Sequence, residues 1–196
     1  MNPDFITVVS GLPRSGTSLM MQMLHAGGLP VLTDGVRAAD ENNLRGYLEF
    51  EPVKRMRSDR SWLPQAQGHV VKIIHLLLRE LLLDGSLQYR IVFMQRPIDE
   101  VIASQQAMLQ RDGKTGADPA VLKRAFDGQL AQLQPWLANQ PAIAVLPVSY
   151  HRALSASQVV ADELAAFLGL PLDTAAMATA VDPALHRQRS ATTGAP

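Results

Sequence analysis

The sequence predicts an α/β fold, with a central parallel sheet of about four to five strands flanked by helices in three layers. Short apolar, β-branched segments alternate with helix-forming stretches, and no hairpin signal joins neighbouring strands. A glycine-framed loop, residues 11–16, lies between the first strand and the first helix. A strand, a glycine loop and a helix in this order are typical of an anion site, because the helix start leaves backbone N–H groups unpaired.

The first half of the chain contains three of the expected strands. The apolar runs at residues 5–10, 69–74 and 89–94 predict strands, and the third is rich in β-branched and aromatic residues. A helix is expected over residues 16–26, where the pair Gly27 and Gly28 ends it. Two further helices are expected over residues 48–60, from the spacing of apolar and charged residues, and over residues 75–83. Residues 29–47 are polar and without periodicity, which is typical of a binding loop or lid.

The second half alternates in the same way. Pro97 is well placed as the first residue of a helix that runs to about residue 111, and Asp118-Pro119 begins another that runs to about residue 137. A fourth strand is expected at residues 142–148. Serine capping predicts a helix from Ser155 or Ser157 to residue 168, and a short helix follows at residues 173–180. We expect one domain over residues 1–189 and a disordered tail over residues 190–196.

Composition limits the class of function. The 18 basic and 18 acidic residues balance, which argues against a general nucleic-acid or membrane-surface binder. The absence of cysteine excludes disulfides, thiolate metal sites and a cysteine nucleophile. No apolar stretch reaches the roughly 20 residues that a membrane span needs, and no signal peptide is evident. We therefore expect a soluble, cytoplasmic protein.

The glycine loop carries the first candidate site. The spacing of Gly11 and Gly16 resembles a phosphate-binding P-loop, but Thr17 occupies the position where such a loop has its lysine. The cation instead is Arg14, inside the loop. Because the missing lysine serves the β- and γ-phosphates of ATP or GTP, its absence argues against an ordinary NTPase.

Arg96 and Ser104 form the second candidate site. Arg96 follows the strand at residues 89–94, and Ser104 lies eight residues later in the next helix. In a parallel sheet the carboxyl ends of the strands meet at one edge, where ligands bind. Both residues could therefore reach one phosphate, although a capped helix start with a buried serine is the structural alternative.

Four segments together resemble the sulfotransferase superfamily of P-loop type: GLPRSGTS, VVKIIHLL, YRIVFMQRPIDEVIASQ and VLPVSYHRAL. The resemblance spans roughly residues 5–170 and implies a three-layer P-loop fold and the co-substrate 3'-phosphoadenosine 5'-phosphosulfate (PAPS), with no metal. It implies that the first loop binds the 5' end of the nucleotide through Arg14, Ser15, Gly16, Thr17 and Ser18. It also implies that Arg96 and Ser104 hold the 3'-phosphate and that Tyr150 lies near the nucleotide.

The sequence also departs from the family. Leu19 stands where many cytosolic members have a tryptophan that stacks on adenine, and an Arg-Lys-Gly segment near the C-terminus is absent. The segment 186–189, His-Arg-Gln-Arg, is a candidate substitute for that segment.

The resemblance implies a catalytic role for Arg14, which would stabilise charge on the leaving nucleotide, but it leaves the general base open. His75 lies near the place of a family Lys-Thr-His segment, with one extra residue, and Asp34 lies where protein-tyrosine sulfotransferases have a catalytic glutamate. Alternatively, His75 is simply part of an apolar segment, and Asp34 is a turn residue in Thr33-Asp34-Gly35. Glu49 and Glu51 could line the acceptor site or face solvent.

The expected activity is transfer of a sulfuryl group from PAPS to a hydroxyl or amine of a small-molecule, glycan or peptide acceptor. The sequence does not identify that acceptor or the oligomeric state. A P-loop kinase or NTPase is one alternative, and a non-catalytic nucleotide-binding protein is another.

Overall fold

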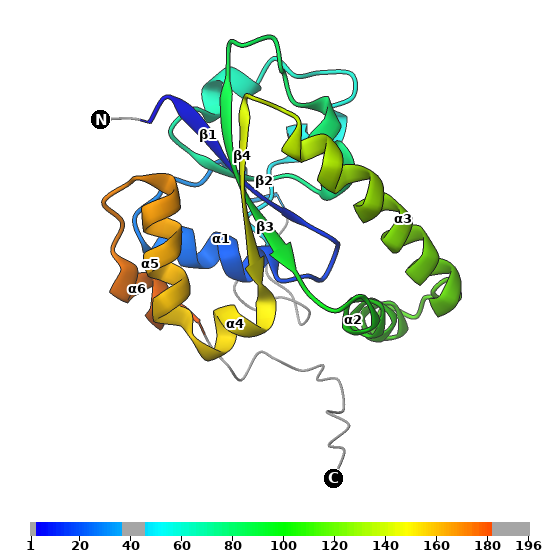
Figure 1. The fold of residues 1–196 in the computed structure, drawn as a ribbon. Coiled ribbons are helices and arrows are strands. Elements are labelled where there is room, and N and C mark those ends of the chain that lie inside the picture. Colours follow the sequence, from blue (N-terminus) through cyan, green and yellow to red (C-terminus); the bar gives the residue numbers. More distant parts are fainter. Residues whose placement is uncertain (1–2, 37–45, 182–196) are drawn as a thin grey trace.

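The computed structural model describes residues 3–36 and 46–181. Four parallel strands form one sheet in the order β2-β1-β3-β4 (Figure 1). They are β1 (Phe5–Gly11), β2 (Val70–Lys72), β3 (Gln88–Gln95) and β4 (Ile143–Ser149). Helices lie around this sheet, which confirms the predicted α/β fold.

The strand register brings the candidate segments to one edge of the sheet. Gly11 at the end of β1 lies opposite Met94 in β3, and Gln95 lies opposite Ser149 in β4. The glycine loop, Arg96 and Tyr150 directly follow these three strand ends. Every residue of β1 is buried, as expected of a central strand covered on both faces.

Helices cover one face of the sheet. They are α1 (Thr17–Ala26), α4 (Tyr150–Ser155), α5 (Ser157–Leu168) and α6 (Thr174–Thr179). Their buried side chains form one apolar cluster with the strands, centred on the methionines of α1 and the aliphatic residues of α5. This packing fixes the start of α1 beside the carboxyl ends of the strands.

A second apolar cluster covers the opposite face. It contains residues of α3 (Pro119–Ala138) and of three short 3₁₀ helices, η1 (Glu51–Arg55), η2 (Leu63–Ala66) and η3 (His75–Glu80). The helix α2 (Ile98–Arg111) packs on α3 through a smaller cluster that includes Leu12 of the glycine loop. The loop therefore packs on the α2–α3 pair.

No helix among the described residues is long and apolar enough to cross a membrane.

Some expected elements differ from the structure. The helix expected over residues 48–60 is wrong, because Leu48 has a positive φ of 49°, Phe50 is extended and only η1 forms there. The helix α4 was not expected; at six residues it is too short to show a helical period. The expected tail at residues 190–196, the segment 186–189 and part of the expected loop at residues 29–47 lie outside the described residues.

Candidate functional site

The glycine loop has the tight conformation that its glycines predict. Gly11 and Gly16 have φ values of 149° and 102°, and Ser15 N donates to Leu12 O at 3.1 Å to close the turn. A Cβ on Gly16 would lie 2.5 Å from Cδ2 of the Tyr150 ring, so the loop backbone directly abuts that ring. Arg14 adopts φ 68° without being glycine, a conformation that costs roughly 1 kcal/mol or more.

The start of α1 follows the loop directly. Gly16 is the N-cap residue, and no described side chain caps this helix start. Thr17 and Ser18 are half-buried, whereas the Ser15 side chain is buried against Gly11 and has no hydrogen-bond partner among the described residues. Backbone donors and the hydroxyls of Thr17 and Ser18 are therefore the groups of this segment that suit an anion.

Arg14 links the two candidate sites. Its Nε donates to Ser104 Oγ at 3.2 Å, and its carbonyl oxygen accepts from NH1 of Arg96 at 3.2 Å. The structure thus brings together residues that are 82 and 90 positions apart in the chain. Arg14 belongs to the glycine loop, but its side chain contacts Ser104 of the second candidate site.

Arg96 is held by Glu100 and Tyr150 besides Arg14. Its Nε donates to Glu100 Oε2 at 2.9 Å, and its guanidinium lies 4.5 Å from the centre of the Tyr150 ring. The same Glu100 oxygen lies 2.9 Å from Nε2 of His151. Burial raises the pKa of Tyr150, and the nearby positive charges of Arg96 and Arg14 oppose that shift. The Tyr150 ring therefore touches both the glycine loop and Arg96.

Lys72 is a site residue that the sequence interpretation did not select. It ends β2, is buried, and its Nζ donates to Ser18 Oγ at 3.0 Å and to the carbonyl oxygen of Tyr47. The carboxylate of Glu49 lies 3.7 Å from the same Nζ. Lys72 thus supplies a cation beside the start of α1. No periodic signal in the sequence marks it, because its place beside the start of α1 follows from the adjacency of β2 and β1.

His75 lies away from these contacts. It is buried, and Nε2 lies 2.8 Å from Oε1 of Gln129 in α3. This amide oxygen is an acceptor, so the ring proton lies on Nε2. Its Nδ1 is buried and has no hydrogen-bond partner among the described residues. The neighbouring side chains of Ile74 and Leu76 are exposed.

Asp34 is bound on both of its carboxylate oxygens. Oδ1 accepts from Val36 N at 3.1 Å and Oδ2 from Glu51 N at 2.6 Å. Slight burial raises the pKa of Asp34, but these backbone donors and the charge of Lys54 outweigh it and lower the pKa overall. The contacts favour a role in joining residues 33–36 to η1 over a role as a base.

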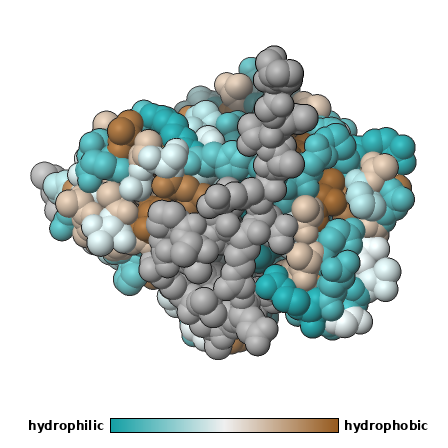
Figure 2. Space-filling view, turned by 90° about the horizontal axis from the view of Figure 1, so that it is seen from below, coloured by the Kyte–Doolittle hydropathy of each residue, from teal (hydrophilic) through white to brown (hydrophobic). Residues whose placement is uncertain are grey.

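The described part of the strand-end face is largely polar. Figure 2 shows the molecule from the side on which β3 and β4 end in Figure 1, and teal and white residues predominate there, with brown residues in separate small areas. The described residues contain no cluster of three or more His, Cys, Asp or Glu side chains that could hold a metal ion.

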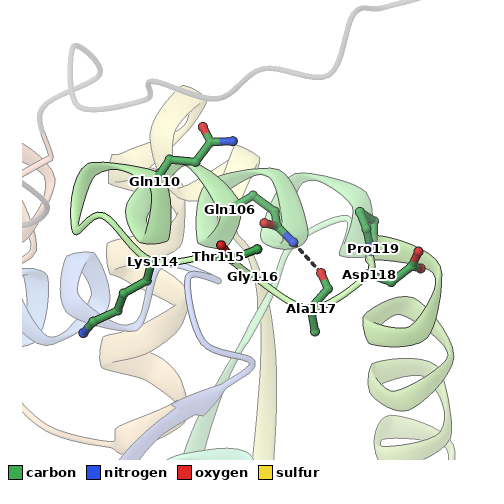
Figure 3. Close-up of a pocket in the computed structure, with 8 residues that line it drawn as sticks. All are labelled: Gln106, Gln110, Lys114, Thr115, Gly116, Ala117, Asp118 and Pro119. Atoms are coloured by element: carbon green, nitrogen blue, oxygen red, sulfur yellow. Dashed lines mark hydrogen bonds between the residues drawn. The ribbon is translucent and has the colours of Figure 1, made fainter.

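A hollow of about 490 Å³ lies elsewhere, between the end of α2 and the start of α3 (Figure 3). Gln106 crosses it and donates from its amide to Ala117 O at 2.7 Å. None of the predicted site residues lines this hollow, and its charged lining residues are Lys114 and Asp118. It is therefore separate from the site at the sheet edge.

Comparisons with known proteins bear on the fold. No family model and no curated protein matches the chain. Among solved structures, it is similar to the sulfotransferase domain from the Synechococcus PCC 7002 olefin synthase, with a TM-score of 0.56, 19% identity and coverage of 100% of this chain and 90% of that one. It is also similar to mouse sulfotransferase SULT7A1, solved in complex with PAP, with a TM-score of 0.50, 13% identity and coverage of 90% of this chain and 62% of that one. The chain therefore has the fold of the sulfotransferases.

Proposed function

We propose that this protein is a sulfotransferase that uses PAPS as the sulfuryl donor and a hydroxyl or amine as the acceptor. The observation that carries the proposal is the junction of the two candidate sites, where Arg14 contacts both Ser104 and Arg96. One ligand with anionic groups at two ends fits such a junction. The sulfotransferase fold supports the same conclusion.

The donor set fits a nucleotide with a 5'-phosphosulfate and a 3'-phosphate. On one side lie the first-turn N–H groups of α1, the hydroxyls of Thr17 and Ser18 and the ammonium of Lys72. On the other lie Arg96, Ser104 and the guanidinium of Arg14. All these groups can donate hydrogen bonds, and the three basic side chains are cations, as anionic groups require. We assign the first set to the 5' end and the second to the 3'-phosphate, with the Tyr150 ring beside the nucleotide.

The proposed chemistry divides between the nucleotide and the chain. When bound, PAPS supplies an activated sulfuryl group for in-line transfer. Lys72 and the N–H groups of α1, which we assign to the 5' end, then stabilise the negative charge that develops on the leaving phosphate oxygen. Lys72 is held in position before the reaction by Ser18 and Tyr47, and Arg14 is held at the 3'-phosphate site by Ser104.

A base must also take the proton of the acceptor. His75 and Asp34 are the candidates from the sequence, and the structure adds Glu49. Glu49 is connected through Lys72 to Ser18 at the start of α1, whereas the contacts of Asp34 join it to the backbone of Val36 and Glu51. We therefore propose Glu49 as the base, with His75 as the alternative.

Calorimetry with adenosine 3',5'-bisphosphate tests the donor assignment. We expect binding without magnesium, and we expect Arg96→Ala to weaken it by roughly 1.5–3 kcal/mol, the range for hydrogen bonds to charged groups. Adenosine 5'-monophosphate lacks the 3'-phosphate and should bind parent and variant alike. Magnesium-dependent binding of ATP, with none of the bisphosphate, would instead identify a kinase or NTPase.

Activity needs a separate experiment. Labelled PAPS is incubated with panels of phenols, alcohols, sugars, amines and peptides, and transfer of label is measured. Transfer to one class identifies the acceptor. Bisphosphate binding without transfer to any class would indicate a non-catalytic nucleotide-binding protein.

A further inference from the structure

The contacts of Glu100 connect the proposed 3'-phosphate site to a histidine on another helix. Glu100 is almost fully buried, and its Oε2 lies 2.9 Å from both Arg96 Nε and His151 Nε2. The side chain of His151 is 45% exposed, whereas those of Arg96 and Glu100 are 5% and 4% exposed. His151 is thus the member of this group that faces solvent.

We propose that His151 is a positioning residue that makes the affinity for the 3'-phosphate depend on pH, acting through Glu100 on Arg96. The inference rests on the proposed function, since it needs a phosphate at Arg96. It assigns a role to His151, which neither the motifs nor the fold comparison identifies.

The geometry defines where the proton moves. An ionised carboxylate only accepts hydrogen bonds, so both Arg96 Nε and His151 Nε2 donate to Glu100. Nε2 therefore carries a proton whether the ring is neutral or charged. A second proton can be added only at Nδ1, so the Nε2 contact with Glu100 is kept in both charge states.

The charge balance then gives the direction. With neutral His151, the charges of Arg96 and Glu100 cancel within this group. A proton on His151 leaves the group with a net positive charge and attracts Glu100, so Arg96 is less compensated by its carboxylate. A phosphate dianion should bind this state more tightly.

The elements around Glu100 and His151 carry other charged or titratable groups. Arg14 of the glycine loop adds a positive charge, and the Tyr150 phenol lies on the same helix as His151. Two further charged pairs of the described residues lie on these elements: Arg152 of α4 with Glu163 of α5, and Asp99 of α2 with Lys123 of α3. Histidine is the side chain whose charge ordinarily changes between pH 5 and 8, and His151 is the histidine in contact with Glu100.

The test is calorimetric titration of adenosine 3',5'-bisphosphate from pH 5.5 to 8.0. His151→Gln keeps a side-chain N–H for Glu100 but never becomes charged. We expect the parent to lose about fivefold more affinity than His151→Gln over this range, the effect of one added charge several ångströms away in a partly hydrated site. The exposed His25 of α1 provides the control, and His25→Gln should behave as the parent.

A second ligand isolates the 3'-phosphate. Adenosine 5'-phosphosulfate lacks it, so the difference between parent and His151→Gln should vanish. The phosphates of the ligand also change their ionisation over this pH range, but this affects the measured affinity of each protein equally. Identical pH profiles for parent and His151→Gln with the bisphosphate would overturn this inference alone, whereas no binding of bisphosphate by any of the proteins would overturn the proposed function with it.

Discussion

Nε of Arg14 donates to the hydroxyl of Ser104 at 3.2 Å, so the glycine loop and α2 are directly connected at the edge of the sheet. If both side chains contact one bound nucleotide, their contributions to affinity depend on each other. We expect Arg14→Gln and Ser104→Ala each to weaken bisphosphate binding. The double variant should lose less than the sum, with a coupling of about 0.5–3 kcal/mol by calorimetry.

The control for this cycle is Gln110→Ala, an exposed residue on the same helix. Its combination with Arg14→Gln should be additive within about 0.5 kcal/mol. Additive losses in the Arg14 and Ser104 pair as well would show that the contact has no role in binding.

The contact between Gly16 and Tyr150 predicts that this glycine is irreplaceable. In Gly16→Ala the new Cβ would lie 2.5 Å from the ring, on a backbone with φ 102°. The loop or the ring must then shift, so we expect bisphosphate affinity to fall at least about tenfold, and thermal stability to fall by about 1–3 kcal/mol. Gly128→Ala is the matched control, because Gly128 lies in α3 with no atom within 4 Å of its added Cβ. That variant should be stabilised by up to about 1 kcal/mol. Parental stability and parental bisphosphate affinity in Gly16→Ala would refute the close contact.

Sequence reasoning predicted the strands and long helices because their signals are local. The apolar run of β1 and the Pro97 start of α2 are examples, and both lie within about a residue of their expected bounds. Residues 48–60 show why the rest failed. Asp34 accepts from Glu51 N and Tyr47 O accepts from Lys72, and these long-range contacts tether the ends of the 47–51 segment, in which Leu48 has φ 49° and Phe50 is extended.

The sequence predicted which segments meet at the candidate site, but not the individual contacts between them. The rule that parallel strand ends meet at one edge indicated that Arg14 and Arg96 lie close together. The direct contact of Arg14 with Ser104 depends on the adjacency of β1 and β3, which the sequence does not specify. Lys72 was missed because one lysine inside a short apolar run gives no periodic signal, and only the fold places it beside Ser18.

Lys72 should therefore be required for turnover. Lys72→Met keeps the buried aliphatic volume but removes the cation, and we expect turnover with saturating PAPS and a screened acceptor to fall about a hundredfold or more. Circular dichroism and thermal melting should show a folded protein. The exposed Lys54, which pairs with Glu51, gives the control Lys54→Met, with turnover near that of the parent. Parental turnover in Lys72→Met would exclude Lys72 from the reaction.

The three candidate bases differ in what their surroundings allow, and that difference can be measured. The lowered pKa of Asp34 makes it a weak proton acceptor, so Asp34→Asn should keep most of the turnover at saturating donor. Glu49→Gln should lower turnover about a hundredfold or more, within the range for a lost general base. Because Glu49 also pairs with Lys72, the bisphosphate affinity of Glu49→Gln must be measured separately. A large fall in turnover with little change in that affinity would assign the loss to proton transfer.

His75→Gln should have the smaller effect, because His75 is buried and its Nε2 is bound to Gln129. A larger loss in His75→Gln than in Glu49→Gln would reverse the assignment, and parental rates in both variants would exclude both residues as the base.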